Sequence, residues 1–433
     1  MRGLLAFGLI LVLGAPAVAQ PRRLPQPEPP NPIAADAPAA LRPFYNALRD
    51  LQAGRRQRVT ILQIGDSHTA NDHFSGRLRD LFQQQFGNAG RGLMPAGVPY
   101  PYYRPYQVSV SQSPGWIVWN SFRGDTAAYG VTGYTLHATT PEQMSLEAGI
   151  DYPFDEIEID YLRQPGGGHI DVQIDGRPVG SIATVGNQVQ ASSQRFTAGR
   201  RAQTVTLTAR GDGVVDLIGW NVLRNDRGVV LAAEGFSGAT VDILDRFDPQ
   251  IAAWQIKRLD PALIILAFGT NEGFQTTLSI DDYADALAAR LTILRAEAPN
   301  AAILLVGPPN SERLPSYCAN TAAQKERMRC APLSKTETAN YAALLNGKSR
   351  QLCHWHVPPN IQVVRDIERR VAQQQGAYFW DWQKVLPGYC GMDAWARAKT
   401  PLAHADRVHM REDGYFRSAE TLYGEIMHFY RSR

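Results

Sequence analysis

Three polar residues in two distant segments of the sequence have the types and spacing needed for acyl transfer. Ser67 lies in the stretch Gly-Asp-Ser-His at residues 65–68, directly after the apolar run 59–64. A serine becomes a nucleophile when a base takes its proton, and His409 is a base that titrates near neutral pH. Asp406 precedes His409 by three residues, so a helical turn there would let the carboxylate hold the imidazole.

Two further positions can supply hydrogen-bond donors to a developing oxyanion. Gly238 follows the apolar run 229–234, and Asn271 follows the apolar run 262–268. The backbone N–H groups of Ser67 and Gly238 and the side-chain amide of Asn271 would provide three donors. Small residues at these positions also let a substrate approach the backbone closely.

Each of these residues also has a structural interpretation. Gly-Asp-Ser alone is usually a turn, Gly238 can serve a tight turn, and Asn271 can cap a loop. His404 is a rival base, but it has no acid at a suitable spacing and is expected at the rim. Asp66 is expected to accept a hydrogen bond within its turn, and His68 is a poor base because neighbouring residues rarely face each other.

The aromatic stretch at residues 99–106 offers side chains that can stack on sugars or pack between domains. Tyr102, Tyr103 and, further along, Trp116 are the candidates for substrate contact, together with His68. The sequence favours neither stacking nor packing.

The elements that must position these residues follow two patterns. Buried-type apolar runs alternate with helical periodicity in most of the chain, which is typical of an α/β fold with a parallel sheet and helices on both faces. Expected strands are residues 59–64, 229–234, 262–268, 302–307 and 377–382; expected helices are 40–51, 240–259, 279–297, 359–375 and 412–430.

The segment from about residue 90 to 225 lacks helical periodicity. It shows short alternating runs separated by Gly-rich turns, which favours a β-sandwich or jelly roll inserted after the first strand–helix unit. The expected strands are residues 156–162, 169–175, 181–185, 203–209 and 214–220.

With these elements in place, the four segments resemble the conserved blocks of the SGNH (GDSL-like) hydrolases. The matching letters are GDSH at 65–68, the Gly238 segment, GTN at 269–271 and DRVH at 406–409. The resemblance implies acyl esterases on a flavodoxin-like three-layer domain, with Ser67, His409 and Asp406 as the catalytic triad and Ser67, Gly238 and Asn271 as the oxyanion hole. It implies no metal and no cofactor. The departure is His68, where the common pattern has leucine.

The resemblance is more specific for the periplasmic peptidoglycan O-acetylesterases of the Ape type. GDSHTANDHFSGRLRDLFQQQFGNAGRGLMPAG and EGFSGATVDIL are similar to that group, in which a carbohydrate-binding-module-like β domain interrupts the hydrolase. The domains expected are 41–93 and 226–433 for the hydrolase and 94–225 for the insert.

The N-terminus predicts export. A basic start at Met1-Arg2, an apolar stretch at 4–13 and Ala-Val-Ala at 17–19 indicate a signal peptide over 1–19, followed by a Pro-rich linker over 20–40. The apolar stretch is shorter than a membrane-spanning helix, so no span is expected after removal of the signal. We expect a periplasmic protein.

The net charge and the cysteines limit which ligands and cross-links are expected. The formal charge of +3 gives no reason to expect nucleic acid. In an exported chain four cysteines favour disulfides, expected here as Cys318–Cys330 and Cys353–Cys390. The alternative, a metal site at Cys353 with His354 and His356, matches no standard zinc spacing.

The sequence therefore predicts an exported serine esterase that removes O-acetyl groups from a cell-envelope glycan, with peptidoglycan first and association with the cell wall. Two alternatives stay open. One is an O-acetyltransferase with the same triad, and the other is a glycan-binding envelope protein with a vestigial site.

Overall fold

The computed structural model describes residues 38–125 and 127–431. The expected signal peptide and all but the end of the expected linker lie outside the described residues. The short helix η1 (Ala39–Leu41) and helix α1 (Arg42–Gln52) begin the described chain, close to the predicted helix at 40–51. No helix in the described part of the chain combines the length and apolar character needed to cross a bilayer.

A five-stranded parallel sheet forms the centre of the molecule. Its strand order is β13-β1-β14-β15-β16, and every neighbouring pair is parallel. If only the five strands of this sheet are numbered, in the order in which they occur in the chain, the spatial order is 2-1-3-4-5, which is that of the flavodoxin-like fold. The strands are β1 (Arg58–Gly65), β13 (Gly228–Gly235), β14 (Pro261–Ala267), β15 (Ala302–Gly307) and β16 (Tyr378–Asp381).

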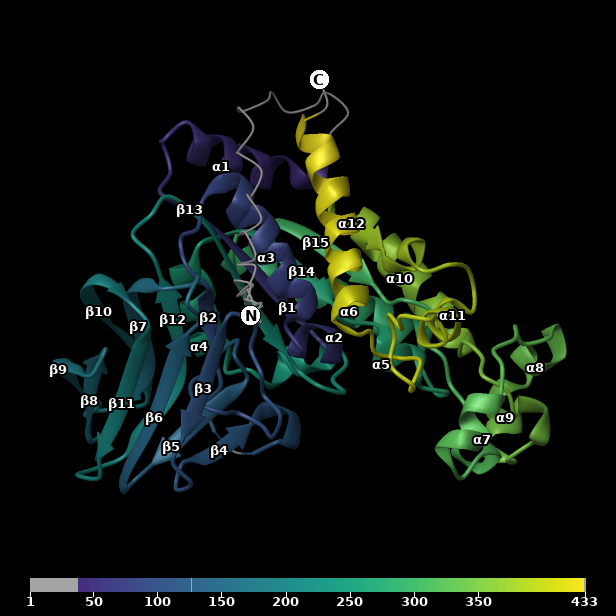
Figure 1. Cartoon of the computed structure of the whole chain (residues 1–433), viewed down its shortest axis with the longest axis horizontal. Coiled ribbons are helices and arrows are strands. Elements are labelled where there is room, and N and C mark those ends of the chain that lie inside the picture. The colour runs from purple at the N-terminus through teal and green to yellow at the C-terminus, as the bar shows by residue number, and fades with distance from the viewer. Residues whose placement is uncertain (1–37, 126, 432–433) are drawn as a thin grey trace, which may run out of the picture.

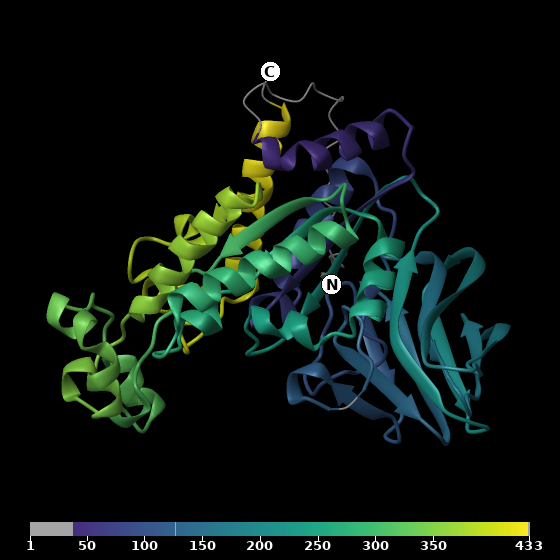
Figure 2. The same cartoon turned by 180° about the vertical axis from the view of Figure 1, so that it is seen from behind.

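Helices cover both faces of this sheet because its strands are apolar on both sides. Val59 and Ile61 of β1 belong to one buried cluster, and Leu62 and Ile64 belong to the other. Figure 1 shows one helical layer and Figure 2 the opposite one. The first layer contains α1, α3 (His73–Phe86) and α12 (Glu412–Arg431), and the second contains α4 (Pro249–Leu259), α6 (Ile280–Glu297) and α10 (Pro359–Gln374).

The predicted helix over 240–259 is wrong in one respect, because the chain breaks there. A 3₁₀ helix, η3 (Val241–Arg246), precedes α4, and Phe247 and Asp248 between them are extended. Pro249 occupies the first turn of α4, and the Asp248 side chain accepts hydrogen bonds from the backbone N–H groups of Gln250 and Ile251. Proline suits a helix start and cannot continue a helix through its interior, so this position begins a new helix.

Between β1 and β13 the chain forms two antiparallel sheets. One has the order β10-β7-β12-β5-β4, with β2 beside β12, and the other β3-β6-β11-β8-β9. The first comprises β2 (Gly92–Met94), β4 (Ile117–Asn120), β5 (Tyr134–Ala138), β7 (Phe154–Arg163), β10 (Gln190–Ala202) and β12 (Val215–Leu223). The second comprises β3 (Val108–Gln112), β6 (Pro141–Ala148), β8 (His169–Ile174), β9 (Arg177–Ala183) and β11 (Thr204–Arg210).

The inward side chains of both sheets share one buried cluster, which also continues into the parallel-sheet domain. The five strands predicted in this region overlap β7, β8, β9, β11 and β12. The remaining strands were not predicted.

Helix α4 also contacts this β region: Gln255 donates a hydrogen bond to Asp160 at 3.0 Å, and Arg258 forms ion pairs with Glu158 and Asp160. The β region is thus tied to the parallel-sheet domain through buried polar contacts as well as apolar ones.

The predicted disulfides are wrong in their pairing. The structure joins Cys318 to Cys353 and Cys330 to Cys390, with Cα–Cα distances of 5.1 and 5.7 Å. The prediction paired each cysteine with its neighbour in sequence and did not account for the fold of the segment between Cys318 and Cys353. Short helices α7 (Ala322–Arg327), α8 (Lys335–Ala339) and α9 (Tyr341–Asn346) fill the segment between Cys318 and Cys353 and return the chain to its start. Cys353 and Cys330 each bond to a cysteine that only the tertiary fold brings close. The spacing of the cysteines in the sequence therefore could not predict the connectivity.

Candidate active site

Ser67 is placed at the carboxyl end of β1 by a tight strand-to-helix connection. It is the first residue of the four-residue helix α2 (Ser67–Ala70), which Asp66 caps by accepting the N–H of His68 at 2.9 Å. A Cβ atom at Gly65 would lie 2.6 Å from the Ala267 carbonyl oxygen on β14, so only glycine fits this close approach. Asp66 is 1 % exposed and acts as the turn acceptor that the sequence predicted.

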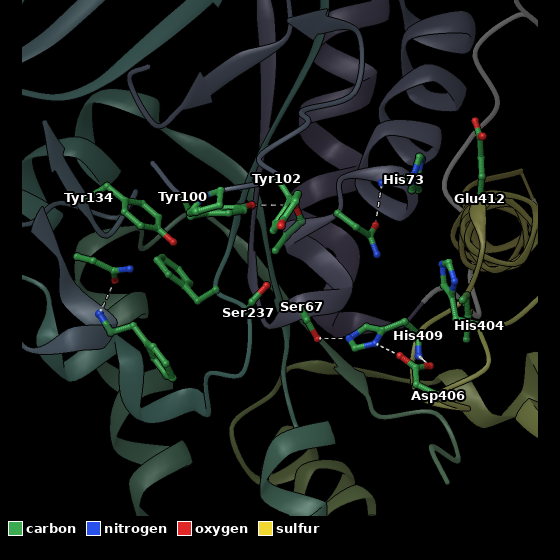
Figure 3. Close-up of a pocket in the computed structure, with 17 residues that line it drawn as sticks. Ser67, His73, Tyr100, Tyr102, Tyr134, Ser237, His404, Asp406, His409 and Glu412 are labelled. Atoms are coloured by element: carbon green, nitrogen blue, oxygen red, sulfur yellow. Dashed lines mark hydrogen bonds and ion pairs between the residues drawn. The ribbon is translucent and has the colours of Figure 1, made fainter. Parts of the chain in front are cut away.

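Ser67, His409 and Asp406 form a continuous hydrogen-bonded chain (Figure 3). Ser67 Oγ lies 2.9 Å from His409 Nε2, and His409 Nδ1 lies 2.8 Å from Asp406 Oδ2. The imidazole tautomer with its proton on Nδ1 donates to Asp406 and leaves Nε2 free to accept the hydroxyl proton of Ser67. The three residues therefore have the geometry of a nucleophile, a base and an orienting acid.

The chain around Asp406 and His409 is a non-helical turn, so the two residues meet without the helical turn that the sequence allowed as one way to bring them together. Asp406 Oδ1 accepts the backbone N–H groups of Val408 and His409 at 2.9 and 3.0 Å. Arg407 between them adopts a positive φ of 55°. An Asx turn of this kind folds the chain back within three residues, and this brings the carboxylate to the imidazole without a helix.

The electrostatics of this turn favour a charged acid beside a basic imidazole. The hydrogen bond that His409 donates to Asp406 raises the pKa of His409 above its usual value, against the opposing effect of burial. Burial by itself would raise the pKa of Asp406, but hydrogen bonds from the His409 side chain and from two backbone N–H groups lower it to about 2. Asp406 is therefore ionised wherever His409 can act as a base.

Buried Arg407 anchors this turn to the disulfide-bonded part of the chain. Its guanidinium contacts Asp393 Oδ1 at 3.2 Å and Glu326 Oε2 at 2.8 Å, and it lies over the ring of Trp355. The Arg407 side chain is 1 % exposed, whereas Glu326 is 55 % exposed. The position of the His409 turn consequently depends on Asp393, 14 residues before Arg407, and on Glu326, 81 residues before it.

The oxyanion candidates lie on two adjoining loops. Gly238 follows β13 with a φ of 81°, which favours glycine. Asn271 lies in α5 (Thr270–Gly273), which follows β14, and its Nδ2 donates to the Ala239 carbonyl at 2.8 Å. This bond uses one amide proton and fixes Asn271 against the Gly238 loop, leaving the second proton to donate elsewhere.

A neighbouring carboxylate holds the same two loops together. Glu272 accepts the Val241 N–H at 2.7 Å and the Gly269 N–H at 3.0 Å. The loops after β13 and β14 are thus bound to each other beside β1, at the point where the strand order of the sheet reverses. Ligands bind at this point in open α/β sheets.

Ser67 and His409 open into a cavity of about 620 Å³ between the parallel-sheet domain and the β region. His73, His404 and Glu412 line it on the side of the hydrolase-like domain (Figure 3). The β region contributes a largely aromatic wall, made of Tyr100, Pro101, Tyr102, Asn120, Phe122 and Tyr134. Since the insert supplies one wall, it shapes the space in front of Ser67.

Of the four weak candidates for substrate contact, Tyr102 alone lines this cavity. It is 90 % exposed and adopts an unusual positive φ of 69°. His68 is buried against Tyr415, and its burial lowers its pKa to about 3, so it is a neutral packing residue. Tyr103 packs edge-on against Tyr100, and Trp116 is a core residue whose Nε1 donates to the Gln143 carbonyl.

The sequence missed several cavity residues. Tyr100 belongs to the aromatic stretch that was singled out, but Tyr134 and Phe122 lie in segments with no distinguishing pattern. His404 lies at the rim, as expected for a residue without an acid partner. Cys353 is disulfide-bonded and therefore offers no thiolate to a metal; the same holds for Cys330 and Cys390, which lie near Glu312.

Comparison with known proteins identifies the family to which the sequence is similar. Residues 196–417, slightly more than half of the chain, match the GDSL-like Lipase/Acylhydrolase family. The chain belongs to the GDSL-like lipase/acylhydrolase family. The matched segment of this hydrolase includes Gly238, Asn271, Asp406 and His409 and begins after Ser67. No curated protein matches the sequence.

Several solved structures are similar to this GDSL-like hydrolase. One, described as "Peptidoglycan O-acetylesterase in action, 5 min", aligns over 90 % of this chain and 97 % of its own with a TM-score of 0.71 and 24 % identity. A family two carbohydrate esterase from Clostridium thermocellum in complex with cellohexaose is 12 % identical, over 74 % of this chain and 98 % of its own, with a TM-score of 0.29. At these identities, the first structure establishes a shared fold.

Proposed function

We propose that this hydrolase is an exported serine esterase that removes O-acetyl groups from a cell-envelope glycan, with peptidoglycan as the substrate. The observation that carries the proposal is the hydrogen-bonded chain from Ser67 through His409 to Asp406, open to a cavity of about 620 Å³. The similar solved structure is a peptidoglycan O-acetylesterase, which supports the choice of substrate. Two disulfides suit a periplasmic location.

The reaction follows from the hydrogen bonds of the triad. His409 Nε2 takes the proton of Ser67 as Oγ attacks the acetyl carbonyl, and Asp406 stabilises the imidazolium that forms. The backbone N–H groups of Ser67 and Gly238 and the free amide proton of Asn271 stabilise the oxyanion; one such donor is worth about 3–4 kcal/mol of barrier. The sugar alcohol leaves with the proton from His409, and water then hydrolyses the acetyl-enzyme.

The aromatic wall of the β region is proposed to hold the sugar. Tyr102 is exposed, lines the cavity and is held in a backbone conformation that tyrosine rarely adopts. Such strain is retained where the surrounding structure uses it. We therefore assign Tyr102 as a stacking platform, and the insert as a carbohydrate-binding domain of the jelly-roll type over about residues 94–225.

The test is acetate release from a chromogenic acetyl ester and from O-acetylated peptidoglycan. Ser67→Ala and His409→Ala should each reduce release from both substrates by at least 10³-fold, since either removes part of one catalytic unit. Ser237→Ala is the matched control, because Ser237 lines the same cavity and is exposed. Loss of activity in Ser237→Ala with activity kept in Ser67→Ala would overturn the assignment of the nucleophile.

The same assay separates hydrolysis from the two alternatives. An added glycan acceptor that becomes acetylated faster than acetate appears would indicate a transferase. A folded wild-type protein that binds glycan but turns over neither ester would indicate a vestigial site, and would refute the proposed esterase.

A further inference from the structure

The loop closed by the Cys318–Cys353 disulfide carries a concentration of positive charge that the chemistry at Ser67 does not use. Between these cysteines the sequence has six Lys and Arg residues and two Glu residues, a net charge of +4, whereas the whole chain has +3. The remainder of the molecule is therefore nearly neutral. The loop therefore accounts for the net positive charge of the chain.

All six cations of this loop are exposed and available. None forms an ion pair or a side-chain hydrogen bond with another residue that the structure describes. They are Lys325, Arg327, Arg329, Lys335, Lys348 and Arg350.

Both acids of the loop are already engaged elsewhere. Glu326 pairs with Arg397 and Arg407, each at 2.8 Å, and both of these lie outside the loop. Glu337 accepts the backbone N–H of Ser334 at 2.7 Å in a capping box. Neither carboxylate neutralises one of the six exposed cations.

The loop is held rigidly although most of its surface is exposed. The first disulfide closes its two ends, and the second, Cys330–Cys390, joins its middle to the residue that precedes α11 (Gly391–Ala396). The Glu326 pairs add a third attachment. A surface that is already ordered loses little conformational entropy when it binds a partner.

The surface fits a soluble polyanion better than a bilayer. None of the large hydrophobic side chains described between residues 318 and 353 is exposed, so the loop has no apolar anchor for a membrane interior. It also lies far from the β region: in Figures 1 and 2, α7, α8 and α9 project at one end of the long axis and the antiparallel sheets lie at the other. A small ester in the cavity would not reach it, whereas a polymer could.

We propose that the Cys318–Cys353 loop is an electrostatic docking surface for the peptide carboxylates of peptidoglycan. The identity of the polymer, and hence of its anion as a peptide carboxylate, rests on the proposed function, whereas the preference for a polyanion rests on the charge of the loop. Docking holds the polymer near the enzyme while one acetylated sugar enters the cavity. The loop acts on affinity for the polymer and takes no part in the chemistry at Ser67.

The experiment compares three proteins in the oxidised state, each also carrying Ser67→Ala for the binding measurement. The first is otherwise unchanged, and the second replaces the six loop cations by Gln. The third is the matched control, in which Gln replaces six exposed cations outside the loop that form no ion pair with a described residue: Arg42, Arg177, Arg227, Arg246, Arg370 and Lys399. Binding to purified sacculi is measured by co-sedimentation, with sacculi stripped of peptides by an amidase and phosphatidylglycerol vesicles as the other two probes.

The six-fold variant is expected to bind intact sacculi about tenfold more weakly, since electrostatic attraction follows the summed charge. The control should change less than twofold, and amidase treatment should remove the difference between the proteins. Binding of the unchanged protein should also fall as salt is raised, because exposed charges are screened. In proteins that keep Ser67, the six substitutions in the loop should raise KM for sacculi and leave turnover of the chromogenic ester unaltered.

Unchanged binding in the six-fold variant would overturn the docking proposal. So would a loss confined to vesicles, which would indicate a phosphate surface, or a difference that persists on peptide-free glycan. These outcomes are distinct from failure of the proposed function: a protein that binds sacculi through the loop but releases no acetate would keep the docking surface and lose the esterase.

Discussion

Asp406→Asn removes the charge of the proposed triad acid while preserving the fold of its turn. Asp406 Oδ2 faces His409 Nδ1 at 2.8 Å, and Oδ1 accepts the backbone N–H groups of Val408 and His409. Asparagine retains an oxygen at Oδ1 for both backbone bonds. The amide nitrogen then takes the place of Oδ2 and cannot accept from His409 Nδ1–H, so the substitution tests the charged acceptor opposite the imidazole and not the shape of the loop.

The size of the effect follows from the one hydrogen bond that changes. A hydrogen bond to a charged group contributes about 1.5–3 kcal/mol, which corresponds to about 10- to 150-fold in rate. Where the acid of a serine protease is buried, the same change costs about 10⁴-fold. The Asp406 side chain is 47 % exposed, so water can partly replace the lost interaction, and we expect the smaller range.

The pH dependence gives the second, independent readout. His409 must be neutral to accept the proton of Ser67, so kcat/KM rises with pH through the pKa of His409. Asp406 raises that pKa, and its replacement should move the midpoint of the rise to lower pH even as the plateau falls. Initial rates on a chromogenic acetyl ester between about pH 5 and 9 would measure both quantities.

Asp282→Asn serves as the control, since Asp282 is an exposed acid in the first turn of α6, away from the cavity. It should leave both the plateau and the midpoint unchanged. A plateau lowered by less than threefold in Asp406→Asn, or a midpoint that stays in place or moves to higher pH, would refute the role assigned to Asp406.

Three other substitutions test separate parts of the site. Asn271→Ala should lower kcat by about 10²–10³-fold with little change in KM, because an oxyanion donor acts in the transition state; a rise in KM alone, measured by steady-state kinetics, would contradict this. Tyr102→Ala should raise KM for O-acetylated glycan by about 3- to 10-fold through the lost stacking contact, and equal effects on a small ester would argue against a sugar platform. Arg407→Met should destabilise the fold by about 1.5–3 kcal/mol, because it removes one of the two arginines that pair with the mostly buried Asp393 and leaves Arg397 as the other; the denaturation midpoint would measure this, and an unchanged midpoint and kcat would show that the anchor is dispensable.

The parallel sheet and its strand ends were predictable from the sequence because buried parallel strands are continuous apolar runs. Such runs at 59–64, 229–234 and 262–268 became β1, β13 and β14. The polar segments after them follow the strand order, so their convergence at one edge of the sheet could be inferred without coordinates. Ser67, the Gly238 loop and Asn271 are brought to that edge by local chain direction alone.

Other features depend on contacts that no local pattern encodes. Strands such as β3, with serines at its outward positions, pair by tertiary register and have a weak strand pattern in the sequence. Tyr134 enters the cavity because the β region packs against the parallel-sheet domain. The sequence could not distinguish the Asx turn at Asp406 from a helical turn because both bring residues three apart together, and the disulfides followed the fold and not the spacing of the cysteines.

Arg407 joins a locally encoded feature, the turn that carries His409, to tertiary contacts that the sequence does not encode. The proposed acid and base of the triad, Asp406 and His409, are three residues apart and their turn is local, yet the turn is held by an arginine whose partners Asp393 and Glu326 lie on the disulfide-bonded segments. Cys330–Cys390 fixes those segments to each other, since it joins the chain just after Glu326 to the chain just before Asp393. The distance between Ser67 and His409 therefore depends on a connectivity established only in the folded, oxidised protein, which links the geometry of the triad to the compartment in which the disulfides form.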